Sequence, residues 1–318
     1  MIVSLTHEHD LDGLGSQAII KRYFDLKDKD NTSKLMLLYA QYIDFSDKIR
    51  FILNSDEHPK ELIISDIGYN ESFLEIFPLI KKALARGCRI SWFDHHIVDS
   101  DVKEKIKSMT TIYLNDEEKC AAEIVQNHFL PDDDIAIRIS ELAHDSDFKP
   151  IKIKLAKKLQ SIIGFNRGEE KLQERRSMVD LLSNGEFSHQ WFDSQLKSIN
   201  NWIEEQSILA LNTAEKYPLD KKKEFVISFS KIGGGKINDI LREKYPGMFA
   251  YIGIDIRFGE IIIHSDYINC RDFALSFGGG GHKERAGFKY KEILSQEGSI
   301  DPQFIQDMKQ ELINQSYR

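Results

Sequence analysis

Short apolar runs alternate with helix-like amphipathic stretches through the first 150 residues of the chain. The apolar runs cover residues 2–5, 34–40, 61–68 and 89–93, and the first three are each followed by a stretch of helical character. Alternation of this kind predicts a parallel β-sheet flanked by helices. The fold class expected for this part of the chain is therefore α/β.

Three of the apolar runs end in side chains that bind metals or transfer protons. Thr-His-Glu-His-Asp follows the first run at 6–10, Ser-Asp ends the third at 65–66, and Asp-His-His follows the fourth at 94–96. Ligands of open α/β sheets bind beyond the carboxyl ends of the strands. We therefore expect these clusters to meet at one edge of the sheet.

The second half of the chain changes character twice. Residues 120–182 are helical in pattern, residues 190–216 have the periodicity of one long amphipathic helix, and proline with charge at 217–223 predicts a linker. Strand-like runs and a glycine cluster at 277–288 follow, and they predict a smaller α/β domain with a mixed sheet.

These patterns predict two domains. The expected bounds are 1–188 for the first domain, 189–222 for a linker helix and linker, and 223–318 for the second domain.

The composition is that of an ordinary globular protein, and the net charge limits the kinds of ligand that the chain is expected to bind. The 318 residues are 41% hydrophobic and 30% charged, and no apolar run approaches the roughly 20 residues that span a membrane. A net charge of −8 argues against long nucleic acid, which needs a basic face, and favours a small anionic ligand. Cys88, Cys120 and Cys270 form no CxxC pair or disulfide framework, and we find no secretory signal. We therefore expect a cytoplasmic protein.

The segment HEHDLDGLGS at 7–16 carries the first candidate chemistry. Asp10 and Asp12 are two residues apart, so a kinked loop can aim their carboxylates at two neighbouring ions. Gly13 and Gly15 allow a tight turn into the next helix. By itself the motif is weak, because Asp-x-Asp-Gly also occurs in solvated loops.

Acids elsewhere strengthen the metal hypothesis. Asp66, Asp94 and Asp145 add carboxylates, and so many acids would repel one another without cations. Carboxylates and imidazoles without a thiolate suit Mn²⁺ or Mg²⁺, with Co²⁺ or Zn²⁺ as alternatives. Two ions about 3.5–4 Å apart are the usual device for hydrolysing phosphate esters. The candidate groups are Asp10, Asp12, Asp66, Asp94, Asp145, His7, His9, His95 and His96.

These motifs resemble the DHH phosphoesterase superfamily. THEHDLDGLGS, IISDIG, FDHH and AHDSDF stand in the family's order, and FGGGGHKERAGF is similar to the glycine-run, histidine, Ala-Gly mark of the DHH-associated domain. The resemblance covers about residues 1–150 and 220–290. It implies a catalytic domain at 1–188 and a substrate-binding domain at 223–318, with the active site in the cleft between them. The DLDGLGS and WFDHH motifs are most similar to those of the branch of nanoRNases and cyclic-nucleotide phosphodiesterases.

The resemblance implies a role for each matching residue. The implied ligands of the first ion are His7, Asp10 and Asp66, and those of the second are Asp12, Asp66, His95 and Asp145, with Asp66 bridging the two.

The resemblance also implies roles for residues beside the metal ligands. His96 faces the substrate phosphate, and Asp94 supports a histidine or the loop from behind. His7 is preferred over His9 because it follows the strand directly and has loop left to curl, but His9 stays an alternative.

The C-terminal motif implies the contacts to the substrate. Glycines bring backbone N–H groups close to an anion. Many relatives carry Arg-Ser where this chain has His264-Ser265, so Arg271 and Arg285 are candidates for the missing phosphate contact, with a surface role as the alternative. The implied substrate-binding residues are Ser265, Arg271, Gly279, Gly280, Gly281, His282 and Arg285.

The function expected from the resemblance is a metal-dependent phosphodiesterase. It hydrolyses short oligonucleotides or small nucleotides, cyclic ones included, to mononucleotides by two-metal activation of water, with Mn²⁺ preferred and Mg²⁺ or Co²⁺ as alternatives. A 3′-phosphoadenosine-5′-phosphate phosphatase is the main alternative, and a non-enzymatic nucleotide-binding protein is a third. Binding to a membrane or to long nucleic acid is not expected. A homodimer is left open.

Overall fold

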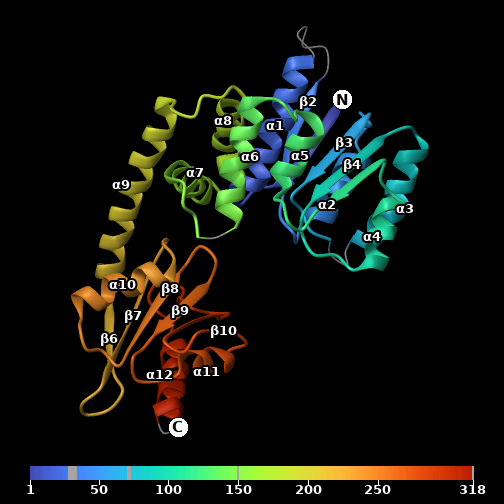
Figure 1. Cartoon of the computed structure of the whole chain (residues 1–318). Coiled ribbons are helices and arrows are strands. Elements are labelled where there is room, and N and C mark those ends of the chain that lie inside the picture. The colour runs from blue at the N-terminus through green and yellow to red at the C-terminus, as the bar shows by residue number, and fades with distance from the viewer. Residues whose placement is uncertain (28–33, 70–72, 149, 317–318) are drawn as a thin grey trace. The chain divides into compact units, whose positions relative to one another are not determined.

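The computed structural model describes residues 1–27, 34–69, 73–148 and 150–316. Contacts between Cα atoms divide the chain into two compact units, Met1–Leu196 and Lys197–Arg318 (Figure 1). None of the helices in the described residues is both long and apolar enough to cross a membrane.

The N-terminal unit is built on a five-stranded sheet in which every pair of neighbouring strands is parallel. Its strands run in the order β2-β1-β3-β4-β5, so the direction of winding reverses between β1 and β3. Ligands of such sheets bind at this switch point. The strands are β1 (Ile2–His7), β2 (Leu35–Ala40), β3 (Glu61–Ser65), β4 (Arg89–Asp94) and β5 (Ile112–Asn115). The predicted parallel α/β sheet is confirmed.

Helices cover both faces of this sheet (Figure 1). Trp92 and its apolar neighbours on one face pack against α2, α3 and α4, whereas α1 packs on β1 and α5 on β3 and β4 of the other face. The helices that precede the second sheet in the chain are α1 (Leu11–Lys27), α2 (Phe45–Leu53), α3 (Phe73–Ala85), α4 (Ser100–Lys107), α5 (Ala121–Phe129), α6 (Asp134–Asp147), α7 (Lys154–Phe165), the 3₁₀ turn η1 (Glu169–Lys171), α8 (Leu172–Ser183) and α9 (Gln190–Asn212), and α9 continues from the first unit into the second.

The segment expected to be a linker forms part of a sheet instead. Helix α9 ends at Asn212, and residues 215–218 form strand β6 (Glu215–Pro218), which pairs antiparallel with β7 (Glu224–Ser230). The charged residues between them make a hairpin turn, in which the carboxylate of Asp220 accepts from the backbone N–H groups of Lys222 and Lys223. Proline and charge therefore marked a turn at an edge strand, where a missing N–H is tolerated.

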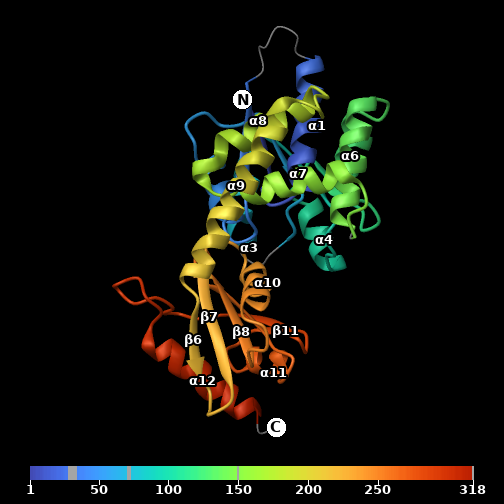
Figure 2. The same ribbon diagram turned by 90° about the vertical axis from the view of Figure 1, so that its left-hand side faces the viewer.

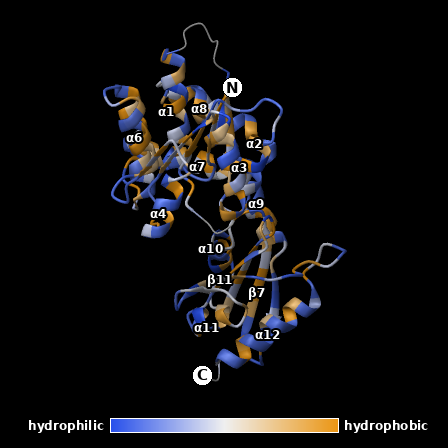
Figure 3. Ribbon diagram, turned by 90° about the vertical axis from the view of Figure 1, so that its right-hand side faces the viewer, coloured by the Kyte–Doolittle hydropathy of each residue, from blue (hydrophilic) through white to orange (hydrophobic). Residues whose placement is uncertain are grey.

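The C-terminal unit contains the predicted mixed sheet of six strands. The order is β10-β11-β9-β8-β7-β6, and only the β7–β8 pair is parallel. Helix α10 covers one face, and α11 and α12 cover the other (Figures 1 and 2). Hydrophobic and hydrophilic residues alternate along α12, as its colours in Figure 3 show. The remaining elements are β8 (Ala250–Asp255), β9 (Glu260–His264), β10 (Gly280–Gly281), β11 (Arg285–Lys289), α10 (Gly234–Lys244), α11 (Cys270–Leu275) and α12 (Pro302–Ser316).

Two glycines of the cluster at 278–281 are required by packing. A Cβ atom at Gly279 would lie 2.2 Å from the carbonyl oxygen of Gly287, and one at Gly281 would lie 2.6 Å from Cα of Ala286. A Cβ atom at Gly280 would meet nothing within 4 Å. The glycines at 279 and 281 are thus explained by the close packing of this segment against β11, although the motif resembles an anion-binding turn.

We predict that Gly279→Ala destabilises the protein and Gly280→Ala does not. The first change forces a methyl group into backbone atoms and costs about 1–3 kcal/mol of unfolding free energy, whereas the second stays within about 0.5 kcal/mol. Urea unfolding followed by circular dichroism measures both. Equal stability of the two variants would contradict the packing explanation.

Candidate metal centre

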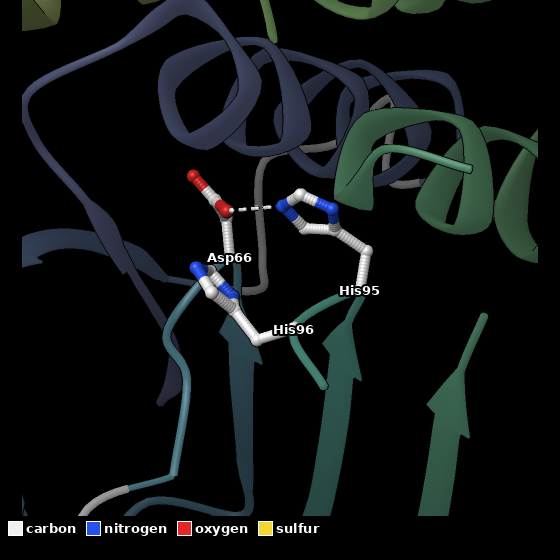
Figure 4. Close-up of side chains that lie close together, drawn as sticks. All are labelled: Asp66, His95 and His96. Atoms are coloured by element: carbon white, nitrogen blue, oxygen red, sulfur yellow. Dashed lines mark ion pairs between the residues drawn. The ribbon is translucent and has the colours of Figure 1, made fainter. Parts of the chain in front are cut away.

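The three polar clusters lie together at the carboxyl edge of the N-terminal sheet. His7 ends β1, Asp66 follows β3, and His95 and His96 follow β4. Figure 4 shows Asp66, His95 and His96 at the ends of two neighbouring strands. The site therefore lies at the switch point of the sheet, as the strand-end clusters predicted.

Asp66 stands between the two halves of this site. Its Oδ1 atom is 3.5 Å from Nε2 of His95, and its Oδ2 atom is 3.6 Å from Nδ1 of His7. The side chain is 3% exposed, and Oδ2 has no hydrogen-bond partner. A buried carboxylate oxygen without a partner is costly. The two oxygens face different imidazoles, and a cation bound at Oδ2 would supply the missing partner.

The backbone of Asp66 is strained in the position that creates this geometry. Its φ is 56°, and among the described residues it is the only one other than glycine with a positive φ. Aspartate tolerates the left-handed region better than most residues do, at some cost. The Asp66 N–H donates to the carbonyl oxygen of Phe93 at 3.0 Å, which holds the turn against β4.

His7 and Asp10 form the first half of the site with Asp66. Nδ1 of His7 lies 2.9 Å from Oδ2 of Asp10, and the N–H of Gly13 donates to the other oxygen at 3.0 Å. Burial lowers the pKa of His7, but its hydrogen bond to Asp10 and the nearby carboxylates of Asp10 and Asp66 outweigh that effect and raise the pKa to about 10. Burial disfavours the charged form of Asp10 and so raises its pKa. The hydrogen bond to His7 outweighs this effect and lowers the pKa of Asp10 well below its usual range.

His9 points to different partners. Its Nε2 atom is 3.7 Å from Oε1 of Glu8, and burial and the nearby Arg167 lower its pKa. The structure therefore brings His7, rather than His9, together with Asp10 and Asp66.

Asp12 and His95 form the second half of the site. Oδ2 of Asp12 is 3.6 Å from Nε2 of His95. The first N–H groups of α5, at Ala121 and Ala122, each donate to one oxygen of Asp12 at 2.7 Å. The helix N-terminus thus fixes the carboxylate.

The third member of this half is Asp147 and not the expected Asp145. Nδ1 of His95 lies 3.7 Å from Oδ2 of Asp147, and these two residues form a metal-type group with Asp12. The carboxylate of Asp145 instead accepts the N–H groups of Lys152 at 3.0 Å and Ile153 at 2.8 Å, at the start of α7. Both acids end α6, and residues two apart on a helix point about 200° apart. Only one of them faces the site.

His96 is held by the acid two residues before it. Nδ1 of His96 lies 2.8 Å from Oδ1 of the buried Asp94, and this bond raises the pKa of His96 against its partial burial. The ring also packs on Gly68, where a Cβ atom would lie 3.1 Å from its Cγ atom. A groove of about 440 Å³ opens beside it, lined by Tyr42, Gly68, Tyr69, His95, His96 and Ile97.

Two residues that carried no sequence signal support the loops of the site. Nδ2 of Asn115 donates to the carbonyl oxygens of Asp94 and His96 at 3.2 and 3.0 Å. Nε1 of Trp92 donates to the carbonyl oxygen of Ile67 at 3.0 Å. Neither contact follows from a motif, because each depends on strands brought together by the fold.

Electrostatics show why a cation suits the site. Burial, followed by the charge of Asp10, raises the pKa of Asp12 to about 6. Burial and the charges of Asp10 and Asp12 raise the pKa of Asp66 well above the usual carboxyl range. A divalent cation would compensate these charges in place of protons. The donors are carboxylate oxygens and imidazole nitrogens, which suit Mn²⁺, Mg²⁺ or Co²⁺.

The expected substrate contacts in the C-terminal unit differ in availability. The Ser265 hydroxyl is buried, donates to the carbonyl oxygen of Phe249 at 2.6 Å and accepts the N–H of Tyr267 at 3.1 Å, so it holds the fold. The side chains of Arg271, His282 and Arg285 are exposed.

Arg285 lies against the glycine turn that begins α10. A Cβ atom at Gly235 would be 1.3 Å from its Nη2 atom, so the guanidinium occupies the space beside this glycine. The KIGGGK segment and Arg285 are therefore neighbours, and Arg285 adds its charge to a helix N-terminus.

Comparison with known proteins identifies the fold. No protein-family model matches the chain, and no curated protein matches it. The chain is similar to the DHH-domain structure of a member of a family of ribosomal proteins, at 16% identity over 99% of this chain and 87% of that one, with a TM-score of 0.57.

Two further solved structures are similar at a lower level. They are a pGpG-specific phosphodiesterase, PggH, from Vibrio cholerae (13% identity, 100% and 99% coverage, TM-score 0.49) and the exonuclease RecJ bound to manganese (12%, 99% and 90%, 0.49). The likeness at 0.57 shows that the chain shares the fold of a DHH domain, and the two weaker likenesses add nothing to it.

We predict that His7→Ala weakens binding of a divalent ion more than His9→Ala does, because only His7 faces Asp10 and Asp66. Calorimetric titration of each variant with Mn²⁺ compares them. Loss of an ion in His9→Ala alone would make His9 the ligand.

The two acids of α6 should separate in the same way. Asp147→Ala should weaken Mn²⁺ binding by more than about tenfold, since even indirect partners of a metal contribute that much. Asp145→Ala should keep Mn²⁺ affinity but lower the unfolding free energy by about 1–3 kcal/mol, because the N–H groups of Lys152 and Ile153 lose their charged acceptor. The reverse pattern would restore Asp145 as the ligand.

Proposed function

We propose that this protein is a metal-dependent phosphoesterase that hydrolyses short oligonucleotides or small nucleotides. The observation that carries the proposal is the carboxylate of Asp66, whose two oxygens face His95 and His7 separately at 3.5 and 3.6 Å. One carboxylate shared by two groups of ligands is the arrangement of two-metal phosphate hydrolysis.

The proposed ligand sets are modest revisions of the ones implied by the motifs. His7, Asp10 and Asp66 would hold one ion, and Asp66, Asp12 and His95 would hold the other, with Asp147 against Nδ1 of His95. Divalent cations at these residues would polarise a phosphoryl oxygen and lower the pKa of a water molecule, and Mn²⁺ is our first choice among them.

His96 is proposed to act on the substrate phosphate. Its side chain is 50% exposed and lines the groove, and Asp94 contacts Nδ1, so Nε2 is the nitrogen proposed to meet the phosphate. The bond to Asp94 favours the protonated ring. Such an imidazolium stabilises charge that develops on phosphate oxygens or gives a proton to the leaving oxygen.

The small size of the proposed substrate rests on charge and on the C-terminal motif. The net charge of −8 disfavours long nucleic acid, whose binding draws on many phosphate contacts. We propose that the exposed His282 and Arg285, with the backbone at Gly280, bind a phosphate of the substrate. The close packing of Gly279 and Gly281 supports this turn from behind.

A panel of phosphoesters with Mn²⁺ tests the proposed function. It holds di- to pentanucleotides, cyclic mono- and dinucleotides, 3′-phosphoadenosine-5′-phosphate and pyrophosphate. Release of mononucleotides from the short oligomers or cyclic compounds supports the proposal. Preference for 3′-phosphoadenosine-5′-phosphate would indicate a phosphomonoesterase, and no turnover of any compound would contradict an enzymatic role.

We predict that Asp66→Ala weakens binding of both ions and lowers turnover by about three orders of magnitude, as the loss of several kcal/mol of transition-state stabilisation requires. Metal content and rates are measured together, with Asp25→Ala on α1 as an exposed carboxylate control. Normal turnover of Asp66→Ala at saturating Mn²⁺ would refute the shared ligand.

A further inference from the structure

A second cluster of metal-ligating side chains lies between α5 and α6. It consists of Cys120, which immediately precedes α5, Glu123 in the first turn of α5 and His144 in the last turn of α6. One donor atom from each residue lies within 4.8 Å of the others. The cluster offers sulfur, oxygen and nitrogen, whereas the centre around Asp66 offers only oxygen and nitrogen.

The contacts within this cluster hold the donors in place. Oε2 of Glu123 accepts the N–H of Cys120 at 2.9 Å and lies 2.7 Å from Nδ1 of His144. The His144 ring stacks on Phe148 with centroids 4.5 Å apart and an interplanar angle of 26°, which fixes its orientation. All three donors therefore come from well-packed helix ends rather than from a surface loop.

The cluster is buried at one end and open at the other. Cys120 is 0% exposed, whereas the side chains of Glu123 and His144 are 27% and 43% exposed. Solvent therefore reaches the carboxylate and the imidazole but not the thiol. Solvent on the open side can supply a fourth ligand.

We propose that Cys120, Glu123 and His144 form a separate site for one zinc-type divalent ion. Cysteine, histidine and a carboxylate are the ligands that Zn²⁺ and Co²⁺ take from proteins, usually in a tetrahedron. Bonds of about 2.0–2.3 Å put tetrahedral ligands about 3.5 Å apart, so the donors need to approach by about an ångström. As the metal–sulfur bond forms, the thiol proton passes to solvent, and His144 exchanges its bond to Glu123 for one to the ion.

The position of this site links it to the proposed phosphoesterase centre without depending on it. Cys120 is followed directly by Ala121 and Ala122, whose N–H groups hold the carboxylate of Asp12. The proposal itself rests only on the donors at α5 and α6, so it can be tested independently of the phosphoesterase function.

Titration of the protein with Co²⁺ alone tests the proposal by absorption spectroscopy. A thiolate bound to Co²⁺ gives an intense sulfur-to-cobalt charge-transfer band in the near ultraviolet, which carboxylate and imidazole ligands do not give. We expect this band to saturate at one sulfur-bound ion per chain. Absence of the band at saturating Co²⁺ would overturn the proposal.

Matched variants assign the band to its sulfur. Cys120→Ser should abolish it while keeping the fold, because serine also caps a helix well; circular dichroism checks the fold. The other cysteines are also buried and free, so Cys88→Ser and Cys270→Ser should keep the full band. His144→Gln should reduce the band at limiting Co²⁺. A band that survives Cys120→Ser would refute the site.

Asp66→Ala separates this test from the test of the phosphoesterase centre. This variant should keep the full charge-transfer band even if it loses both ions of the other centre. Loss of the band in Asp66→Ala, with the fold intact, would show that the two sets of ligands are one site and would overturn the proposal.

Discussion

The Asp66 carboxylate is the constraint on which the rest of this site depends. It is buried at the end of β3, on a backbone with positive φ, and one of its oxygens has no hydrogen-bond partner. A protein folds with such a group only when the surrounding structure outweighs its cost. Trp92 and the strand pairing of β3 with β4 supply that support, because they fix the turn that follows Ser65. The strain and the missing partner both point to a cation as part of the working molecule.

The positions of the other ligands follow from the same sheet edge. His7 arrives on β1 and His95 on β4, which flank β3 on either side. Asp12 comes from the first turn of α1 and is fixed by the N-terminus of α5, and Asp147 ends α6, so three helices and three strands determine the geometry. This explains how a site with several like charges holds its shape. It also means that a change in α5 reaches the proposed metal centre through Asp12.

Much of this could be predicted from the sequence, because apolar runs followed by acids and histidines specify strands with ligands at their carboxyl ends. The parallel sheet, the mixed second sheet and the meeting of His7 with Asp66 follow from that pattern. The choice between Asp145 and Asp147 could not be predicted, because spacing alone does not set which side of α6 faces β4. The hairpin at 217–223 was hidden because proline and charge mark turns and linkers alike. Packing behind Gly279 was equally hidden, because it depends on the pairing of β10 with β11.

The most direct test of the central claim is the electron paramagnetic resonance spectrum of the protein with two equivalents of Mn²⁺. If Asp66 bridges two ions, their spins are coupled, and the signal of isolated Mn²⁺ is replaced by the broader spectrum of an interacting pair as the second equivalent binds. A spectrum of isolated Mn²⁺ that grows in proportion through both equivalents would contradict the bridge and, with it, the two-metal account of this site.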